Sequence, residues 1–444
     1  MAEEKRKEAE EKKKTQEDEK SKLLPNEERK RLIAMCGRVF NPSAPVNKFR
    51  LFAGRIPQLK KIADAINNRG RHAIMYGDRG VGKTSLANIL PEAWESTEGM
   101  KVVKVNCAEA DNYFNVWRKA LSEITVLKEN YVKHDDDKSP VELTLDVMMD
   151  KFQHVGPGEI RQIIQQHSSE NFELVFVFDE FDKLPEPDRH LFADTIKDLS
   201  DNSVSATLVL VGVANDVVQL IEEHASIDRC LVQILMPSMD LFELQEILDK
   251  ALTALGLSME DKASKLIVSL SQGLPHYTHL LGQESAIHAV TDGRKKITQH
   301  DVSAAIKEAM SNSQHTVAND YLRASQGQRV GTLYPKVLLA CALADVDELG
   351  YFSSGDIREP LRQITQEDYD IPGYSKHLHD FSIDESRGPV LEKRGKARRF
   401  RFRFRNPLLR PFIIIKALAE GTLNNELLDY LTTNKSKRNE VTLF

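Results

Sequence analysis

The sequence of 444 residues has few cysteines, no long apolar run and no signal segment, and each absence excludes a class of protein. The four cysteines, Cys36, Cys107, Cys230 and Cys341, form no CxxC pair, so neither a zinc site nor a disulfide framework is predicted. The longest apolar runs have the length of a strand, well short of the ~20 residues that a membrane helix needs. The first residues are charged and have no apolar core, unlike a secretory signal. We therefore expect a cytoplasmic protein with no membrane segment.

The sequence also has no strong net charge, and it contains no recognisable motif for a metal site or for a catalytic nucleophile. Its formal charge is -6, so any nucleic-acid binding has to come from a local basic patch. The close pairs His276 with His279 and His377 with His379 have no cysteine or acid at metal spacing. No Ser-His-Asp or Cys-His pattern is present either. The length predicts two or three domains, at roughly 150 residues each.

Residues 1–31 form a tail in which acidic and basic residues alternate without an apolar face. Pairs such as Glu3 with Lys7 stabilise a solvated helix by about 0.3 kcal/mol each. Two interpretations stay open, a frayed or disordered tail and a helix that binds a partner.

Residues 32–238 carry the pattern of an α/β domain. Five apolar runs alternate with longer helical segments, and the middle runs are apolar on both faces, as parallel strands covered by helices are. The runs span 72–77, 101–107, 172–180, 206–215 and 230–237. We therefore predict a five-stranded parallel sheet.

After Pro237 the pattern becomes helical. Residues 239–312 predict three or four helices without strands, a small helical domain. Residues 313–421 predict three helices, a β-hairpin with its turn near Gly395 and a closing helix, which favours a winged helix-turn-helix. Residues 422–444 predict a polar tail.

A glycine-rich loop follows the first apolar run and precedes a helix. Its residues match GxxxxGK[ST] in full: Gly77, Asp78, Arg79, Gly80, Val81, Gly82, Lys83 and Thr84, followed by Ser85. In such a loop the backbone N–H groups and the helix N-terminus hold phosphates. Lys83 is predicted to reach the β- and γ-phosphates and Thr84 to ligate Mg²⁺. The sequence therefore predicts a site for ATP and Mg²⁺.

The third apolar run ends in Asp179 and Glu180, the pattern of a Walker B strand. Asp179 is predicted to hold Mg²⁺, and Glu180 to orient and polarise the attacking water. Asn215, at the end of the fourth run, is a candidate for holding that water; otherwise it is a turn residue. For Asp182, we favour the role of a surface acid or a helix cap over that of a third metal ligand.

Together these motifs resemble the AAA+ superfamily, over roughly residues 50–420, with the origin-recognition-like branch and related bacterial ATPases as the nearest likeness. The resemblance rests on the Walker A run, DEFD at 179–182, VAND at 213–216, the helical lid and a terminal winged helix. It implies a sheet ordered 5-1-4-3-2 in chain numbering. It also implies ATP between the α/β core and the lid, often between adjacent subunits, and hence a homo-oligomer.

The resemblance also assigns roles to four more residues. Arg55, in the segment FAGR, would help to seat the adenine, and Asn106 would restrain the catalytic glutamate. Arg229 stands where an arginine finger is placed, although a surface arginine in a salt bridge is the alternative. His276 stands where many members have the sensor-2 arginine, and a neutral histidine contacts a γ-phosphate more weakly.

A basic hairpin near the C-terminus is the second candidate site. Phenylalanines alternate there with arginines, so a strand would turn the phenylalanines inward and the arginines outward. The candidate phosphate contacts are Lys393, Arg394, Lys396, Arg398, Arg399, Arg401 and Arg403. The alternative is a solvated wing or a docking face for an acidic protein.

Two functions follow. The first is an ATP-driven switch that assembles with other subunits and acts on DNA. The second is a signalling or antiviral-defence ATPase that controls an effector protein, with the wing as the docking module.

Overall fold

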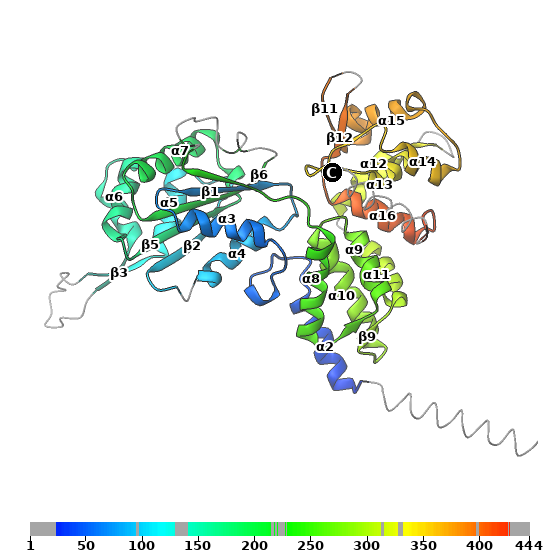
Figure 1. The fold of residues 1–444 in the computed structure, drawn as a ribbon, viewed down its shortest axis with the longest axis horizontal. Helices are drawn as coiled ribbons and strands as arrows, with labels where there is room; N and C mark the ends of the chain where they lie inside the picture. Colours follow the sequence, from blue (N-terminus) through cyan, green and yellow to red (C-terminus); the bar gives the residue numbers. More distant parts are fainter. Residues whose placement is uncertain are drawn as a thin grey trace, which may run out of the picture. The chain divides into compact units, whose positions relative to one another are not determined.

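The computed structural model describes residues 24–94, 97–128, 141–214, 217, 220, 227, 229–311, 315–326, 332–396, 399–424 and 426. The chain divides into two compact units (Figure 1). One unit comprises Pro45–Met239. The other joins the N-terminal residues up to Ala44 to the segment from Asp240 onward.

The first unit is built on a five-stranded parallel sheet. Its strands are β1 (His72–Gly77), β2 (Met100–Asn106), β5 (Glu173–Asp179), β6 (Ala206–Val213) and β7 (Leu231–Leu235). They lie in the order β2-β5-β6-β1-β7, and each neighbouring pair is parallel. Read from β7, this is the predicted order 5-1-4-3-2, so the AAA+ core fold is confirmed.

Helices cover both faces of this sheet (Figure 1). On one side lie α3 (Ile56–Ile66) and α4 (Lys83–Trp94), and on the other α5 (Tyr113–Ser122), α6 (Pro157–His167) and α7 (Glu186–Asp201). Short 3-10 helices η1 (Phe49–Leu51), η2 (Leu145–Lys151) and η3 (Phe181–Lys183) and the hairpin β3 (Thr125–Lys128) with β4 (Val141–Thr144) complete the unit.

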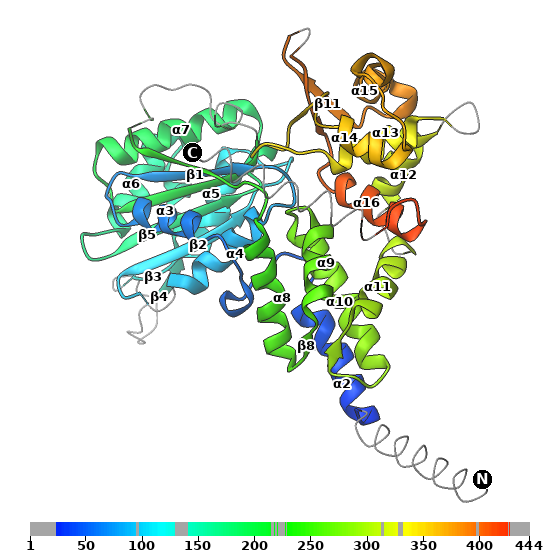
Figure 2. The same cartoon turned by 45° about the vertical axis from the view of Figure 1, so that its right-hand side comes forward.

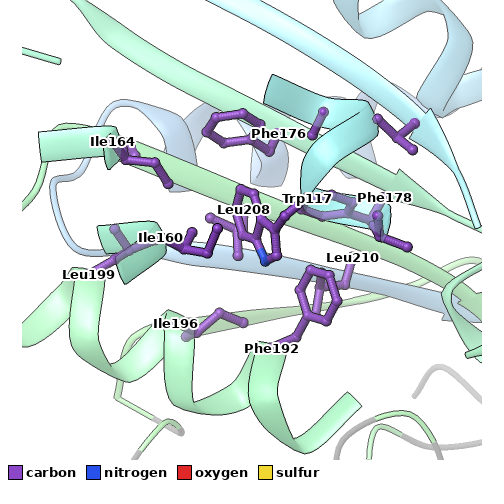
Figure 3. Packing of buried hydrophobic residues seen from close by; sticks show 14 of the residues in the cluster. Trp117, Ile160, Ile164, Phe176, Phe178, Phe192, Ile196, Leu199, Leu208 and Leu210 are labelled. Carbon is purple, nitrogen blue, oxygen red and sulfur yellow. The ribbon is translucent and has the colours of Figure 1, made fainter. Parts of the chain in front are cut away.

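The core of this unit is centred on Trp117 of α5 (Figure 3). The indole stacks edge-on against Phe176 and Phe178 of β5, with ring centroids 5.2 and 5.1 Å away. Phe192 of α7 closes the cluster. Such aromatic contacts add about 0.5–1.5 kcal/mol each beyond area burial, so they fix β5 and the acids at its end.

The second unit contains the helical lid. Its helices are α8 (Leu241–Leu255), α9 (Asp261–Ser271), α10 (Pro275–Thr291) and α11 (Gln299–Ser311), with the short strands β8 (Ser258–Met259) and β9 (Lys296–Ile297). The sequence predicts three or four helices without strands; the four helices agree with this, whereas the expected absence of strands is wrong, because β8 and β9 pair in parallel. An Asp240–Glu243 capping box begins α8, and Gly256 ends it in the left-handed region.

The N-terminal boundary differs from the sequence expectation, which placed residues 32–44 in the α/β core and 1–31 in a tail. Helix α2 (Asn26–Val39) instead lies beside α8 and α10 of the lid (Figures 1 and 2). Leu32, Cys36 and Phe40 recur every four residues and are buried. A Cβ on Gly282 of α10 would stand 2.6 Å from the Phe40 ring, so only glycine admits this contact.

The described residues of the C-terminal part of this unit form five helices and a small antiparallel sheet. They are α12 (His315–Ser325), α13 (Tyr334–Leu343), α14 (Arg358–Thr365), α15 (Ile371–Ile383) and α16 (Leu409–Ala419), with β10 (Phe352–Ser353), β11 (Leu391–Arg394), β12 (Arg401–Phe404) and the 3-10 helix η5 (Glu385–Arg387). The sheet order is β10-β12-β11. The predicted hairpin is confirmed, with Gly395 at φ +94° in its turn. Tyr277 of α10 donates a hydrogen bond of 2.8 Å to the Leu408 carbonyl, which ties this part to the lid.

Within the described part of the chain, no helix has the length and apolar character that crossing a bilayer requires.

Candidate nucleotide-binding site

The glycine-rich loop joins the end of β1 to the start of α4, as the motif predicts. Gly77 has φ +151°, and a Cβ there would stand 2.4 Å from the carbonyl oxygen of Met236. Gly80 and Gly82 also have positive φ, which side chains disfavour. The glycines therefore let the loop pass close to the end of β7 and wrap a phosphate with its backbone.

Lys83 is the first residue of α4, and its side chain folds back over the loop. Its Nζ donates hydrogen bonds to the carbonyls of Gly77 and Asp78, at 2.9 and 2.7 Å. Burial lowers the pKa of Lys83 to about 8, although the carboxylates of Asp182, Asp78 and Asp179 oppose this shift. The ammonium is thus held at the loop by weak acceptors that a phosphate oxygen can replace.

Asp179 ends β5, and its buried carboxylate faces the start of α4. Its Oδ1 accepts a hydrogen bond of 2.9 Å from the Glu180 N–H, and the Thr84 hydroxyl lies 3.5 Å from the same oxygen. The structure thus brings together two residues that the sequence places 95 positions apart. Their roles as metal ligands stay predictions.

The Asp179 and Thr84 oxygens suit a small, hard cation. Among the described residues, the buried Oδ2 of Asp179 accepts no hydrogen bond and has the Lys104 ammonium as an ion partner at 3.2 Å. Buried polar atoms nearly always have a hydrogen-bond partner, so such an atom fits a position that a ligand completes. A carboxylate and a hydroxyl oxygen are donors that Mg²⁺ takes when it also binds phosphate. The residues present therefore fit Mg²⁺.

Lys104 is a residue at this site that the sequence reasoning missed. Its Nζ lies 3.2 Å from Asp179 Oδ2 and donates a hydrogen bond of 2.5 Å to Asn106 Oδ1. Asn106 pairs in register with Asp179, so the two strand ends meet. The signal was a lysine two residues before Asn106, which places both side chains on the same face of the strand.

Glu180 adopts the left-handed conformation, with φ +57° and ψ +35°. This conformation is uncommon for a residue other than glycine, and it persists only where the surrounding structure holds the backbone in place. Its carboxylate pairs with Lys183, 2.7 Å away, on the surface of the next turn. Asp182 accepts a hydrogen bond of 2.7 Å from the Val213 N–H and so ties this turn to the end of β6.

Arg55, for which the resemblance implies a role in seating the adenine, is buried and contacts the phosphate loop. Its guanidinium donates to the carbonyls of Val81 and Pro237, at 2.8 and 2.7 Å. The backbone at Arg55 has φ +63°, which turns the side chain inward. Both hydrogen bonds come from Nη2, so Arg55 joins the phosphate loop to Pro237, just after the end of β7, and its role at the adenine stays a prediction.

Three further candidates make other contacts. Ser85 accepts a hydrogen bond of 3.2 Å from the Val46 N–H. Arg229 pairs with Asp201, and its side chain is 73% exposed; its role as an arginine finger stays a prediction. In the other unit, His276 donates from Nδ1 to the Pro42 carbonyl at 2.8 Å, and burial lowers its pKa. Asn215 lies outside the described residues.

The basic hairpin follows the predicted alternation only in part. Phe402 and Phe404 are buried, and Lys396, Arg399 and Arg401 are exposed. Arg398 lies outside the described residues, and Lys393 lies 3.8 Å over the Phe400 ring.

Arg403 corrects the expectation that every arginine of the ladder points to solvent. Its side chain is 11% exposed and pairs with Glu392 at 2.7 Å. The guanidinium lies over the Tyr351 ring, 4.8 Å from the centroid. Arg394 also pairs with Glu392, and Arg401 with Asp347, so acids and an aromatic ring neutralise part of the ladder.

A glycine-rich phosphate loop after β1, an acid at the end of β5 and this strand order define a P-loop NTPase with an AAA+ core. A comparison with protein families matches residues 46–333 to the family described as Novel STAND NTPase 1. The matched range covers well over half of the 444 residues, so the chain belongs to this family.

Among curated proteins, none matches the chain significantly. Solved structures with a similar fold include the ORC2 protein of Aeropyrum pernix, with 16% identity over 90% of this chain and 98% of that one, and a TM-score of 0.47. The Walker-type ATPase of Pyrococcus abyssi has 14% identity over 85% and 99%, with a TM-score of 0.49. Cdc6p of Pyrobaculum aerophilum has 16% identity over 87% and 99%, with a TM-score of 0.42.

Proposed function

We propose that this NTPase binds ATP together with Mg²⁺ and hydrolyses it, and that nucleotide state switches the protein between forms. The observation that carries the proposal is the meeting of Lys83, Thr84 and Asp179 at one end of the sheet. Lys83 and Thr84 come from the glycine-rich loop and Asp179 from the end of β5, and the three supply an ammonium, a hydroxyl and a carboxylate. This set holds a nucleotide phosphate and its metal in P-loop enzymes.

The chain's own residues divide the work. The backbone of the glycine-rich loop and the N-terminus of α4 would hold the phosphates, and Lys83 would exchange its two carbonyl partners for phosphate oxygens. Thr84 and Asp179 would hold Mg²⁺, which when bound supplies positive charge to the phosphate oxygens. Glu180 would orient the attacking water, after its carboxylate leaves Lys183.

The assignment of Glu180 is tested by Glu180→Gln. The variant should bind ATP with an affinity within about twofold of the wild type, because the phosphate contacts are unchanged, and lose turnover by roughly 10²-fold or more. Lys183→Gln is the matched control, since it removes the ion pair of Glu180 without removing the carboxylate. Nucleotide binding by calorimetry and phosphate release measure the two effects. Turnover that persists in Glu180→Gln would contradict the role.

We further propose that the C-terminal part of the second unit, from α12 to α16, is a winged helix that contacts DNA. Three helices, α13, α14 and α15, precede a hairpin that carries exposed cations at and beside its turn. Exposed lysines and arginines on a hairpin suit phosphate contacts. The surface left for DNA is smaller than the sequence suggested, because Arg403 is buried.

A second output is favoured by the pairing of the wing arginines. Glu392, Asp347 and Tyr351 engage Arg394, Arg401 and Arg403, which reduces the charge available to phosphates. In this second candidate the wing docks a protein, and the chain is a signalling or defence ATPase that controls an effector. DNA affinity and its dependence on salt separate the two candidates.

A further inference from the structure

We propose that Lys104 is a built-in counter-ion of the metal site, which neutralises Asp179 in the metal-free protein and competes with Mg²⁺ for its carboxylate. The proposal rests on the proposed function, in which Asp179 holds the metal. It assigns a role to a residue outside both phosphate-binding motifs.

Lys104 is partly buried at a position where a lysine is usually exposed. It lies on β2, the edge strand of the sheet, where long cationic side chains ordinarily extend into water. Its neighbours Val103 and Val105 face the hydrophobic core, so Lys104 and Asn106 share the opposite face. The Lys104 side chain is only 13% exposed, because it turns toward the end of β5.

The contacts of Asp179 show why an ammonium is present. Oδ1 has the Glu180 N–H, whereas Oδ2 accepts no hydrogen bond from the described residues and has the Lys104 ammonium at 3.2 Å. A buried carboxylate without a cation is strongly unfavourable, and an ion partner offsets part of that penalty. Lys104 therefore offsets the charge of Asp179 and holds its carboxylate in place before the metal binds.

Thr84, the other proposed metal ligand, lies nearest Oδ1, so a metal held by both residues shares the Asp179 carboxylate with the ammonium at Oδ2. A dication and an ammonium at a single carboxylate repel each other, so Mg²⁺ has to displace Lys104 or bind against its charge. Lys104 also donates a hydrogen bond to Asn106, which pairs in register with Asp179, so displacement of Lys104 by the metal would affect Asn106 as well. Metal binding would then release Asn106 from Lys104.

Metal affinity tests the proposal in variants that differ in charge at this one position. Mn²⁺ is titrated by electron paramagnetic resonance into full-length protein with ADP at about pH 8, well above the ordinary carboxylate range. Lys104→Gln removes the charge and should bind Mn²⁺ roughly tenfold more tightly, because a repelling cation is gone. Lys104→Arg keeps the charge and should stay within about twofold of the wild type. Equal or weaker Mn²⁺ binding by Lys104→Gln would overturn the proposal.

A second measurement uses the wild-type protein and does not depend on a variant that folds. Acetic anhydride labels accessible lysine amines, and mass spectrometry reads each position. Labelling of Lys104 should rise at least about threefold when Mg²⁺ is added to the protein with ADP, compared with ADP and a chelator, because the ammonium leaves Asp179. Lys262, on the surface of α9, is the internal reference. Unchanged labelling of Lys104 would count against the exchange.

Failure of this inference is distinct from failure of the proposed function. If Asp179→Asn abolishes Mn²⁺ binding but Lys104→Gln leaves it unchanged, the metal site stands and the counter-ion role is wrong. If the wild type binds no Mn²⁺ with ADP, or Asp179→Asn binds it equally well, the metal site itself is wrong and the counter-ion role falls with it.

Discussion

At the scale of single residues, His72 is a buried group whose ionisation affects stability. It begins β1 and is fully buried. Its Nδ1 accepts a hydrogen bond of 2.9 Å from the Leu208 N–H, and its Nε2 lies 3.1 Å from the Ser200 hydroxyl. The ring therefore carries its proton on Nε2 and is neutral. Burial lowers the pKa of His72 to about 3.

This pKa predicts that acid weakens the α/β unit. Below pH ~6.5 the unfolded chain binds a proton at His72 and the folded chain does not, so the free energy of unfolding falls as pH falls. The fall is about 1.4 kcal/mol per pH unit between pH ~6.5 and ~3. Urea unfolding followed by tryptophan fluorescence measures it, since Trp94 and Trp117 both lie in this unit.

His72→Asn supplies the comparison, because its amide oxygen can still accept from the Leu208 N–H. The variant should be less stable at pH 7 by about 1–3 kcal/mol, since the Ser200 hydroxyl loses the hydrogen bond from His72 Nε2 and keeps those to the Gly70 and Ile196 carbonyls. Below pH ~6.5 the variant should take up about one proton fewer on unfolding than the wild type, so its free energy of unfolding should depend less steeply on pH. An identical pH slope in both proteins would show that His72 does not carry the effect.

Single residues were predicted well where a motif fixes both their type and their spacing. The motif placed Lys83 and Thr84 at the start of a helix, and the structure has them there. Lys104 could not be found in this way, because its meaning depends on the pairing of β2 with β5. The burial of Arg55 and Arg403 also depends on partners distant in sequence, namely Pro237 and Tyr351.

At the scale of elements, the basic hairpin of β11 and β12 decides between the two proposed outputs. Lys396→Glu with Arg399→Glu reverses two exposed cations at and beside its turn. If the wing binds DNA, affinity in low salt should fall by roughly tenfold or more, and the slope of log affinity against log salt should flatten by about two. Fluorescence anisotropy with labelled duplex DNA measures both.

The matched control is Lys262→Glu with Lys265→Glu on α9, which changes the net charge equally on an exposed helix face. It should leave DNA binding nearly unchanged. Equal losses in both double variants would mean that net charge, not the wing, attracts DNA. A wild type that binds no DNA in low salt would leave protein docking as the output of this surface.

The elements themselves were largely predictable, because helices and strands follow from local periodicity. The place of α2 was not, since its apolar stripe of Leu32, Cys36 and Phe40 fits any complementary surface. Gly282, which makes room for Phe40, determines that the surface belongs to α10. Periodicity shows that a face is buried, whereas the partner of that face depends on shape.

At the scale of the whole molecule, the chain combines an α/β unit that carries the nucleotide motifs with a second unit of lid and C-terminal helices. The N-terminal helix belongs to the second unit although the first unit follows it in sequence. The chain therefore passes between the units twice, near residues 44 and 239. A nucleotide-dependent change in one unit has two covalent connections through which it can reach the other.

The most direct test of the central claim is the equilibrium affinity for ATP in Mg²⁺, measured by calorimetry on the full chain and on Lys83→Ala. The account predicts one ATP per chain for the wild type. It also predicts a loss of roughly 10²-fold or more in Lys83→Ala, because a buried charge-assisted contact to phosphate disappears. Equal ATP binding by both proteins, or none by the wild type, would contradict the assignment of Gly77–Thr84 as the nucleotide site.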